Sequence, residues 1–230
     1  MKKALVTGAS GGIGRAVARR LCRDGYFVIL NYNRSGQAAL ALRAEAIHAD
    51  LTDLAQTEAM FRAAGNVDVL VNNAGIAQQK LFTDLTEENW RRMMEVDVGG
   101  VFRCCRLALP HMIHEKRGRI VNISSMWGQV GASCEGSYSA AKAAVIGLTK
   151  ALAKEVGPSG IQVNCIAPGV IGTPMNAGFG PDTLRGLAEE TPLGRLGTPE
   201  DVAETVSFLV SPGADFITGQ VIGVNSGFVI

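Results

Sequence analysis

The amino-acid sequence predicts an α/β fold in which one doubly wound, parallel sheet of seven strands carries helices on both faces. Short apolar runs alternate with stretches of helical periodicity from Lys3 to Val224, which is the pattern of consecutive strand–helix–strand units. Such units join parallel strands through right-handed crossovers. Neither an internal repeat nor a linker-like stretch divides the 230 residues. We therefore expect residues 1–230 to form a single domain.

The composition argues against several classes of partner. Apolar residues make up 47% of the chain, and 22 Lys and Arg residues nearly balance 21 Asp and Glu residues. This balance predicts no basic surface for nucleic acid and no attraction to anionic membranes. No apolar run approaches the ~20 residues of a membrane span, and the apolar run after the initial lysines is too short for a signal peptide. We expect a cytoplasmic protein.

The cysteine and histidine patterns predict neither disulfides nor a metal site. The five cysteines are odd in number and show no C-x-x-C spacing, which favours reduced thiols. His111 and His114 lie on one expected helix without further ligands nearby, as on a solvated helix face.

The first expected strand, Lys3–Val6, leads into the glycine-rich stretch Thr7–Gly14 and then into a helix. In that context Gly8 permits a tight turn, Gly12 lets a pyrophosphate approach the backbone, and Gly14 lets helix and strand pack closely. The spacing Gly-x-x-x-Gly-x-Gly differs from the commonest dinucleotide fingerprint. Taken alone, the stretch predicts either a dinucleotide site or an ordinary strand-to-helix turn.

The second expected strand, Tyr26–Tyr32, ends where a Rossmann fold selects between NAD and NADP. An NAD site usually has an acidic residue there, but residues 31–35 read Asn-Tyr-Asn-Arg-Ser. No carboxylate would repel a 2′-phosphate, and Arg34 with Ser35 could bind it. These residues and Asn31 predict NADP(H); the alternative is that Arg34 is a solvated loop residue.

The next two strands also end at candidate ligand contacts. A brief Ala/Leu-rich helix is expected before a strand near Ala46–Ala49, which ends at Asp50 against the adenine. After a helix over 53–64, the apolar run Val67–Val71 predicts a buried parallel strand. It stops at Asn72-Asn-Ala-Gly75, whose small residues suit a backbone lying against a ligand. For Asn72 itself we favour a structural role in tying neighbouring strands together.

A long helix is expected from the N-cap Thr86 to about residue 116, with a kink or close packing at Gly99 and Gly100. The strand Arg119–Ser125 follows it, and Ser125 falls where this strand leaves the sheet.

The next expected helix opens with Gly136-Ser-Tyr-Ser-Ala-Ala-Lys142. This spacing puts the phenol of Tyr138 and the ammonium of Lys142 on one helix face. A phenol is a weak acid at neutral pH, but a neighbouring lysine cation favours the phenolate and so assists proton transfer. Taken alone, the spacing is also that of an exposed surface pair.

The C-terminal part is expected to contain a strand over 162–166, a helix over 199–210 and a last strand over 220–224. Between them, a glycine- and proline-rich segment extends to residue 198 without expected secondary structure. Its residues 174–192 carry Met175 and Phe179 among hinge-like glycines, which predicts a lid over an apolar substrate. The alternative is a surface loop that does not contact substrate.

Ligands bind such sheets at the carboxyl ends of the strands. The glycine-rich stretch, Asp50, Asn72, Ser125 and Pro168-Gly169 all follow expected strands, so we expect them to meet in one crevice. This convergence is the main reason to expect an enzyme.

With these motifs combined, the chain resembles the short-chain dehydrogenase/reductase family over essentially its whole length. The matching motifs are Thr7-Gly-Ala-Ser-Gly-Gly-Ile-Gly14, Asn72-Asn-Ala-Gly75, Ser125, Tyr138-x-x-x-Lys142, Asn164-x-x-Ala-Pro-Gly169 and Thr218-Gly-Gln220. Within the family, residues 31–35 and 191–203 look most like bacterial 3-oxoacyl-[acyl carrier protein] reductases.

The resemblance implies a catalytic set of Ser125, Tyr138, Lys142 and Asp97. Tyr138 would donate a proton to the substrate's carbonyl oxygen while the nicotinamide delivers hydride to its carbon. Ser125 would hydrogen-bond that oxygen, and Lys142 would bond the nicotinamide ribose. Ile171 with Thr173 would meet the carboxamide. The residues expected to contact NADP(H) are Gly8, Ser10, Gly12, Ile13, Gly14, Asn31, Arg34, Ser35, Asp50, Leu51, Asn73, Ala74, Gly75, Tyr138, Lys142, Pro168, Gly169, Ile171 and Thr173.

One departure from the family pattern lies in the catalytic set. Asp97 stands where the family usually has an asparagine that helps to hold a proton-relay water. An aspartate can accept from this water, but it lacks the amide donor and adds charge beside Lys142. We expect retained but altered activity.

A second departure concerns the surface expected to bind a carrier protein. Lys116, Arg117 and Arg119 supply positive charge there, whereas Ser159 stands where the reductases often have another basic residue.

Three functions are compatible with these features. The first is NADPH-dependent reduction of a 3-oxoacyl thioester carried by acyl carrier protein or coenzyme A. The second is a different short-chain dehydrogenase acting on an alcohol, sugar or steroid, and the third is a non-catalytic dinucleotide sensor. The intact Tyr138 disfavours the sensor, because a binder needs no proton donor. Self-association into a dimer or tetramer is expected through the long helices around Asp97 and Tyr138 and the apolar end Gly227–Ile230.

Overall fold

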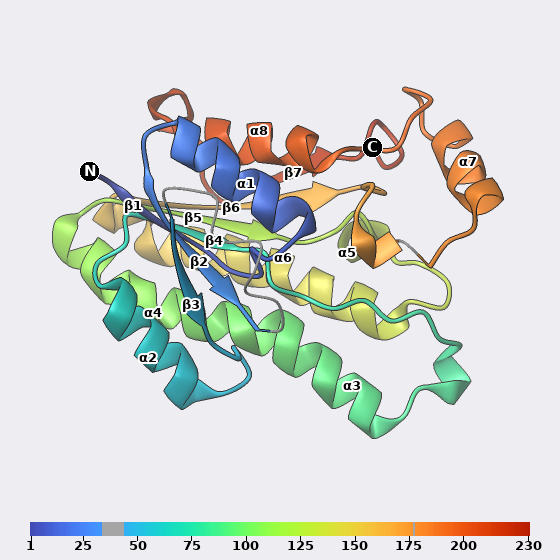
Figure 1. Ribbon diagram of the computed structural model, residues 1–230, viewed down its shortest axis with the longest axis horizontal. Helices are drawn as coiled ribbons and strands as arrows, with labels where there is room; N and C mark the ends of the chain where they lie inside the picture. The colour runs from blue at the N-terminus through green and yellow to red at the C-terminus, as the bar shows by residue number, and fades with distance from the viewer. Residues whose placement is uncertain (34–43, 177) are drawn as a thin grey trace.

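The computed structural model describes residues 1–33, 44–176 and 178–230. Seven parallel strands form one sheet in the order β3-β2-β1-β4-β5-β6-β7 (Figure 1). The strands are β1 (Lys3–Val6), β2 (Phe27–Tyr32), β3 (Ala44–His48), β4 (Val69–Asn72), β5 (Gly118–Ile123), β6 (Ile161–Pro168) and β7 (Val221–Val224). The predicted doubly wound sheet of seven parallel strands is confirmed.

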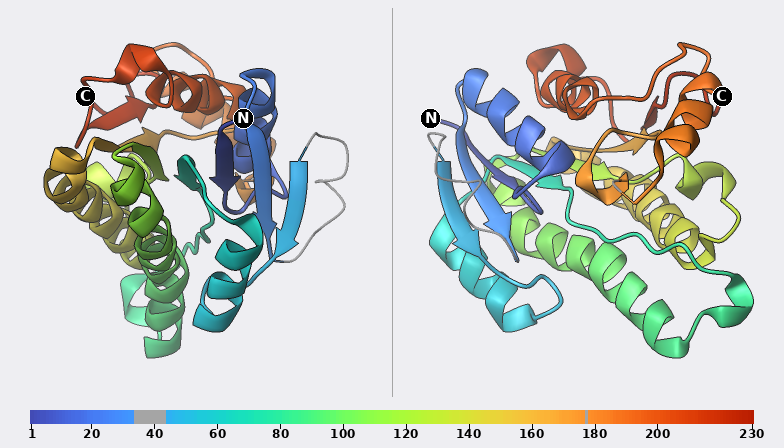
Figure 2. Two further views of the ribbon diagram at one scale, coloured as in Figure 1. Left: turned by 90° about the vertical axis from the view of Figure 1, so that its left-hand side faces the viewer. Right: turned by 45° about the vertical axis from the view of Figure 1, so that its right-hand side comes forward.

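Helices cover both faces of this sheet. Helices α1 (Gly12–Arg23) and α8 (Pro199–Leu209) pack side by side on one face (Figure 1). On the other face lie α2 (Leu54–Ala64), α4 (Gly100–Glu115) and α6 (Gly136–Val156) (Figure 2). Each face therefore buries its own apolar core between helices and sheet.

The strand β1 shows why the strands are continuous apolar runs in the sequence. Leu5 and Val6 are adjacent, and both are fully buried, because successive side chains point to opposite faces of a strand. Val6 joins the core under α1 and α8 with Val17, whereas Leu5 joins the opposite core with Met60. A sheet covered on both faces requires apolar residues at every such position.

The chain order reverses between the neighbouring strands β1 and β4, which places the topological switch point of the sheet there. Asn72 at the end of β4 donates from Nδ2 to Asn122 Oδ1 on β5 at 2.8 Å. Its predicted role in tying neighbouring strands together is confirmed.

The expected helix over 86–116 is continuous but not uniform. Thr86 is its N-cap, as predicted, and accepts a hydrogen bond from the Asn89 N–H. Helix α3 (Glu87–Met94) then passes through a π-helical turn, Glu95–Gly99, into α4. The irregularity is thus a π-helical turn rather than a kink at the glycines. Asp97 lies within this turn, and its side chain is fully buried. Close packing at Gly100 is confirmed, since a Cβ there would lie 3.3 Å from Leu51 Cβ.

The absence of secondary structure expected for residues 174–198 is wrong in part. Helix α7 (Pro181–Glu189) lies within this segment, preceded by a short helical turn, Pro174–Asn176. Pro181 and Asp182 open α7; proline suits the first helical turn and a carboxylate favours the positive end of the helix dipole. The many glycines hid these start signals. A further short helix, α5 (Trp127–Val130), follows β5.

Two expectations lie outside the described residues: the 2′-phosphate contacts of Arg34 and Ser35, and the brief helix before β3. Across the described part of the chain, no helix combines the length and the apolar character needed to span a membrane.

Three cysteines are core residues. Cys104, Cys105 and Cys165 are buried, and burial raises the pKa of Cys105 to about 12 and that of Cys165 to about 11. Thiols with such a pKa are poor nucleophiles at neutral pH, in accord with the predicted reduced state.

Candidate active site

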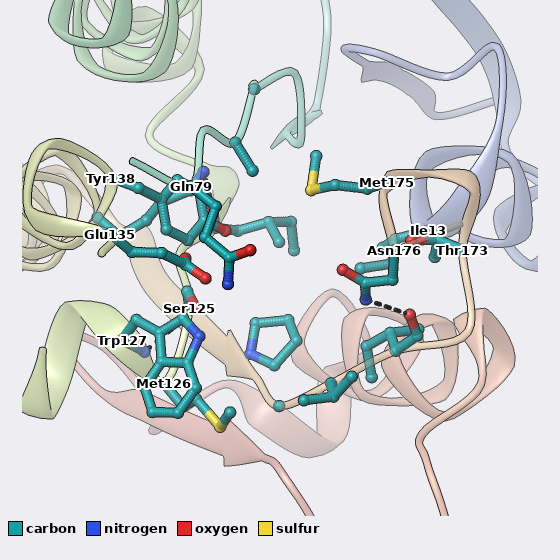
Figure 3. A pocket seen from close by; sticks show the side chains of 18 of the residues that line it. Ile13, Gln79, Ser125, Met126, Trp127, Glu135, Tyr138, Thr173, Met175 and Asn176 are labelled. Atoms are coloured by element: carbon teal, nitrogen blue, oxygen red, sulfur yellow. Dashed lines mark hydrogen bonds between the residues drawn. The ribbon is translucent and has the colours of Figure 1, made fainter. Parts of the chain in front are cut away.

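Two adjoining hollows lie at the carboxyl ends of the strands. The first, which we call the loop crevice, has a volume of about 750 Å³ and follows the glycine-rich turn and the ends of β2 and β4. The second, the inner pocket, has a volume of about 480 Å³ and lies between the end of β5, the start of α6 and the segment before α7 (Figure 3). Both are lined by Ile13, Asn73, Gly75, Thr173 and Met175, so the two hollows are continuous.

The glycine-rich turn fits a ligand backbone closely. Gly8 and Gly12 have φ of 61° and 53°, conformations that favour glycine. A Cβ at Gly8 would lie 2.7 Å from Ala74 Cα, and one at Gly14 would lie 2.5 Å from Asn73 Nδ2. No side chain caps the N-terminus of α1, so its first N–H groups face the crevice as a site for an anion such as a pyrophosphate.

Hydrogen bonds hold the glycine-rich turn and the end of β4 as one unit. Thr7 Oγ1 accepts from the N–H groups of Asn73 and Ala74 at 2.9 and 3.0 Å. In return, Asn73 Nδ2 donates to the carbonyl oxygens of Thr7 and Gly8. Asn73 therefore shapes the crevice floor chiefly by fixing the glycine turn.

The ends of β2 and β3 close the far side of the crevice. Asn31 is buried, donates from Nδ2 to the Ala49 carbonyl at 3.0 Å and accepts from the Gly8 N–H at 3.4 Å. Asp50 accepts from the N–H and the hydroxyl of Thr52, and the backbone bond is the main reason that its pKa lies below the ordinary value. Asp50 is thus an ionised acceptor at the crevice edge.

Ser125, Tyr138 and Lys142 are brought together at the inner pocket. All three are buried and line it, and Lys142 Nζ lies 5.5 Å from the centroid of the Tyr138 ring. Helix α6 is held against the end of β5 because Ser124 Oγ donates to the Lys142 carbonyl at 2.8 Å. The predicted surface-pair alternative for Tyr138 and Lys142 is therefore wrong.

Asp97 lies directly behind Lys142. Its Oδ2 is 2.9 Å from Lys142 Nζ, and its Oδ1 accepts from the Ile76 N–H at 2.8 Å. Burial, the largest single effect, would lower the pKa of Lys142, but the charge of Asp97, the charge of Tyr138 and the Asp97 hydrogen bond together outweigh it and raise this pKa above the ordinary lysine value. Asp97 therefore lies beside Lys142, as expected, where its carboxylate favours the protonated form of Lys142.

The walls of the inner pocket are largely apolar. Met126 and Trp127 come from the turn after β5, and Met175, Phe179 and Leu187 come from the segment 174–192. This segment therefore lines the pocket, and its expected contact with substrate stays a prediction.

A family model described as enoyl-(acyl carrier protein) reductase matches residues 8–229. The 3-oxoacyl-[acyl-carrier-protein] reductase FabG of Staphylococcus aureus is 41% identical over 239 residues, which cover 98% of this chain and 97% of the relative. The chain belongs to the short-chain dehydrogenase/reductase family. Oxidoreductases of this family use a nicotinamide dinucleotide.

Other members of the short-chain dehydrogenase/reductase family match equally completely. The FabG reductase of Vibrio cholerae is 40% identical over 241 residues, 98% of this chain and 96% of the relative. A crystal structure from Agrobacterium tumefaciens named "putative gluconate dehydrogenase" superposes with a TM-score of 0.94 at 32% identity, covering 100% of this chain and 97% of that one. The family resemblance predicted from the motifs is confirmed.

Most of the residues expected from the family resemblance line the two hollows. The loop crevice is lined by Gly8, Ser10, Gly12, Ile13, Asn31, Asp50, Leu51, Asn73, Ala74, Gly75 and Thr173, and the inner pocket also by Ser125, Tyr138, Lys142, Pro168, Gly169 and Ile171. Gly14 instead packs against the turn, and Asp97 lies behind the pocket wall, where it contacts Lys142 and the Ile76 N–H.

The basic residues expected at a carrier-protein surface do not border the pocket. Lys116, Arg117 and Arg119 lie where β5 begins, at the opposite edge of the sheet. There Arg117 pairs with Asp68, and Arg119 pairs with Asp215. Within one chain they are therefore remote from the reacting groups, and their expected contact with a carrier protein stays a prediction.

Among the polar residues of the inner pocket that sequence reasoning missed are Gln79 and Glu135 (Figure 3). Glu135 is the N-cap residue of α6, but its side chain makes no capping hydrogen bond. Its spacing of three residues before Tyr138 was the available signal, because residues three apart at a helix start lie on one side.

Proposed function

We propose that the protein reduces the keto group of a 3-oxoacyl thioester to a hydroxyl group, with NADPH as the reductant. The observation that carries this proposal is the convergence of Ser125, Tyr138 and Lys142 in a largely apolar pocket that opens into the glycine-lined crevice. The FabG relatives supply the substrate class.

The loop crevice has the features that a nicotinamide dinucleotide requires. The close approach permitted by Gly8, the uncapped start of α1 and the ionised Asp50 suit its pyrophosphate and adenosine. Ile171 and Thr173 would meet the carboxamide where the two hollows join. When bound, the reduced cofactor supplies hydride to the substrate's carbonyl carbon.

The side chains of this chain supply the proton and stabilise the developing charge. The Ser125 hydroxyl donates to the substrate's carbonyl oxygen, which gains negative charge as hydride reaches the carbon. Tyr138 transfers its phenolic proton to that oxygen, and the carbonyl π electrons become the new O–H bond. The balance is one hydride and one proton added to the C=O group.

Lys142 and Asp97 act as a buried pair behind Tyr138. The Lys142 cation favours the phenolate that remains after proton transfer. Asp97 shares this cation at 2.9 Å, so it moderates the effect of Lys142 on Tyr138. We infer that Asp97 tunes the proton donor without touching the substrate.

The preference for NADPH rests on residues 31–35. They contain no carboxylate that would repel a 2′-phosphate, and they contain Arg34, a cation suited to bind it. The segment 174–192 would act as the substrate lid, and the acyl group would be carried by acyl carrier protein or coenzyme A in the cytoplasm.

The proposal is tested by following cofactor oxidation with acetoacetyl coenzyme A, in parallel with NADPH and NADH. We expect kcat/KM to favour NADPH by at least about tenfold, since the Arg34–phosphate pair contributes at least ~1.4 kcal/mol. Arg34→Ala should remove most of this preference, and the exposed Arg23→Ala is the matched control. Equal use of both cofactors would contradict the assignment of Arg34, and no turnover with either would contradict the thioester substrate.

A further inference from the structure

One charged group of the inner pocket has no part in the mechanism above. Glu135 lines the pocket with Ser125 and Tyr138, and its carboxylate points into the cavity near the Gln79 amide (Figure 3). Within the described residues, its side chain neither caps α6 nor pairs with a cation. Burying a carboxylate without a partner costs free energy. Glu135 therefore does not stabilise the fold at this position, and we consider what it does to a bound substrate.

The charges around Glu135 make the pocket unfavourable for an anion. Lys142 is the single cationic side chain among the described residues that line it, and its charge is already paired with Asp97 at 2.9 Å. No positive side chain there can therefore balance both Glu135 and a substrate carboxylate.

The half-buried setting strengthens this effect. Apolar side chains, among them Trp127 and Met126, form the walls beside Glu135, and charges interact more strongly where water is excluded. Burial raises the pKa of Glu135 above its ordinary value, as expected for a carboxylate that no cation compensates. Like charges brought together in such a site repel each other and weaken binding.

We propose that Glu135 is a specificity-determining residue that restricts the site to ketones flanked by a neutral ester, thioester or amide, and that excludes free keto acids by charge repulsion. This inference rests on the proposed function, which it narrows. The enzyme reduces 3-oxoacyl groups while they are linked to their carrier and rejects the same groups after hydrolysis.

A matched pair of small substrates isolates this effect. Methyl acetoacetate and acetoacetate have the same 3-oxobutanoyl group and differ in the charge at the carboxyl end. We expect the wild-type protein to favour the ester in kcat/KM by at least about tenfold, and Glu135→Gln to reduce this ratio by about tenfold. The reduction should arise mainly from a lower KM for acetoacetate.

The control is Glu155→Gln, which removes an exposed carboxylate from the far end of the same helix. It should leave the ratio at the wild-type value. Glutamine keeps the size of Glu135 and no capping bond is lost, so Glu135→Gln should fold, and its thermal midpoint reports this directly.

Binding separates this inference from the proposed function. Trp127 lines the inner pocket, so its fluorescence, measured in a Trp90→Phe background, reports the dissociation constants of both compounds without any turnover. An ester preference that falls in Glu135→Gln supports the inference even if acetoacetyl coenzyme A is not reduced. If Glu135→Gln leaves the preference for methyl acetoacetate over acetoacetate unchanged, in binding or in kcat/KM, the inference about Glu135 is overturned even if the thioester is reduced.

Discussion

At the scale of single residues, the ion pair between Asp97 and Lys142 is the feature that most alters the site. Both side chains are buried and their charged atoms are 2.9 Å apart. Gly75 makes this possible, because a Cβ there would lie 2.7 Å from Asp97 Oδ2. Removing one partner of a buried pair leaves an uncompensated charge, at a cost of about 3–5 kcal/mol.

Asp97→Asn tests the role of this pair. The charge of Asp97 is the largest of the effects that oppose burial and raise the pKa of Lys142. Without that charge, burial is opposed less, the pKa of Lys142 falls, and Lys142 loses its proton at lower pH. We therefore expect the alkaline limb of the pH profile of kcat/KM to move to lower pH. The exposed Asp84→Asn is the control, and superimposable profiles for Asp97→Asn and wild type would refute the tuning role.

At the scale of elements, helix α8 depends on a capping box at its start. Thr198 Oγ1 accepts from the Asp201 N–H, and Asp201 Oδ2 accepts from the Thr198 N–H at 2.7 Å. Arg195 adds two bonds to the same carboxylate. The bonds from Arg195, followed by that from the Thr198 backbone, hold the pKa of Asp201 well below its usual range. The start of α8 is therefore fixed to the turn at Arg195, which follows residues 174–192.

Asp201→Asn should lower the free energy of unfolding at pH 7 by about 1 kcal/mol, because the exposed Arg195 pair adds little to the cap itself. A depressed pKa in the folded state means that this contribution is complete above the unfolded value of 3.8 and is lost as the pH falls below it. The difference in the free energy of unfolding between variant and wild type, measured by urea denaturation, should therefore become smaller below about pH 4. A gap of the same size at pH 7 and pH 3 would contradict the assignment, and Glu200→Gln, which removes an exposed charge of the same turn, is the control.

The order of the elements could be predicted from the sequence, because strands buried on both faces are continuous apolar runs and the glycine-rich turn follows β1. The π turn at Glu95–Gly99 could not, since it shifts the helical register by a single residue. Helix α7 was hidden by its glycines. Ser125, Tyr138 and Lys142 carry a sequence spacing, whereas Glu135 depends on what packs around the start of α6, which a linear pattern does not contain.

At the scale of the whole molecule, helix α4 leaves apolar surface exposed. Phe102 is 52% exposed on this helix, and Ile113 is 44% exposed near its end. We expect these side chains to be covered by a second copy of the chain, in accord with the self-association expected around the long helices.

Light scattering should therefore give a mass that is a multiple of 24.2 kDa. Phe102→Glu places a charge in this surface and should shift the mass toward that of one chain, whereas Arg19→Glu, an exposed change on α1, serves as the control for added charge. A wild-type protein that is monomeric at micromolar concentration would show that the exposed face has another purpose.

The most direct test of the central claim compares wild type with Tyr138→Phe in two measurements: turnover of acetoacetyl coenzyme A with NADPH, and NADPH binding by fluorescence. The variant keeps the ring that packs against Met93 and loses the proton donor. We expect turnover to fall by at least about 10²-fold while the dissociation constant for NADPH changes less than about threefold. Undiminished turnover in Tyr138→Phe would contradict the assignment of Tyr138 as the general acid and, with it, the proposed mechanism.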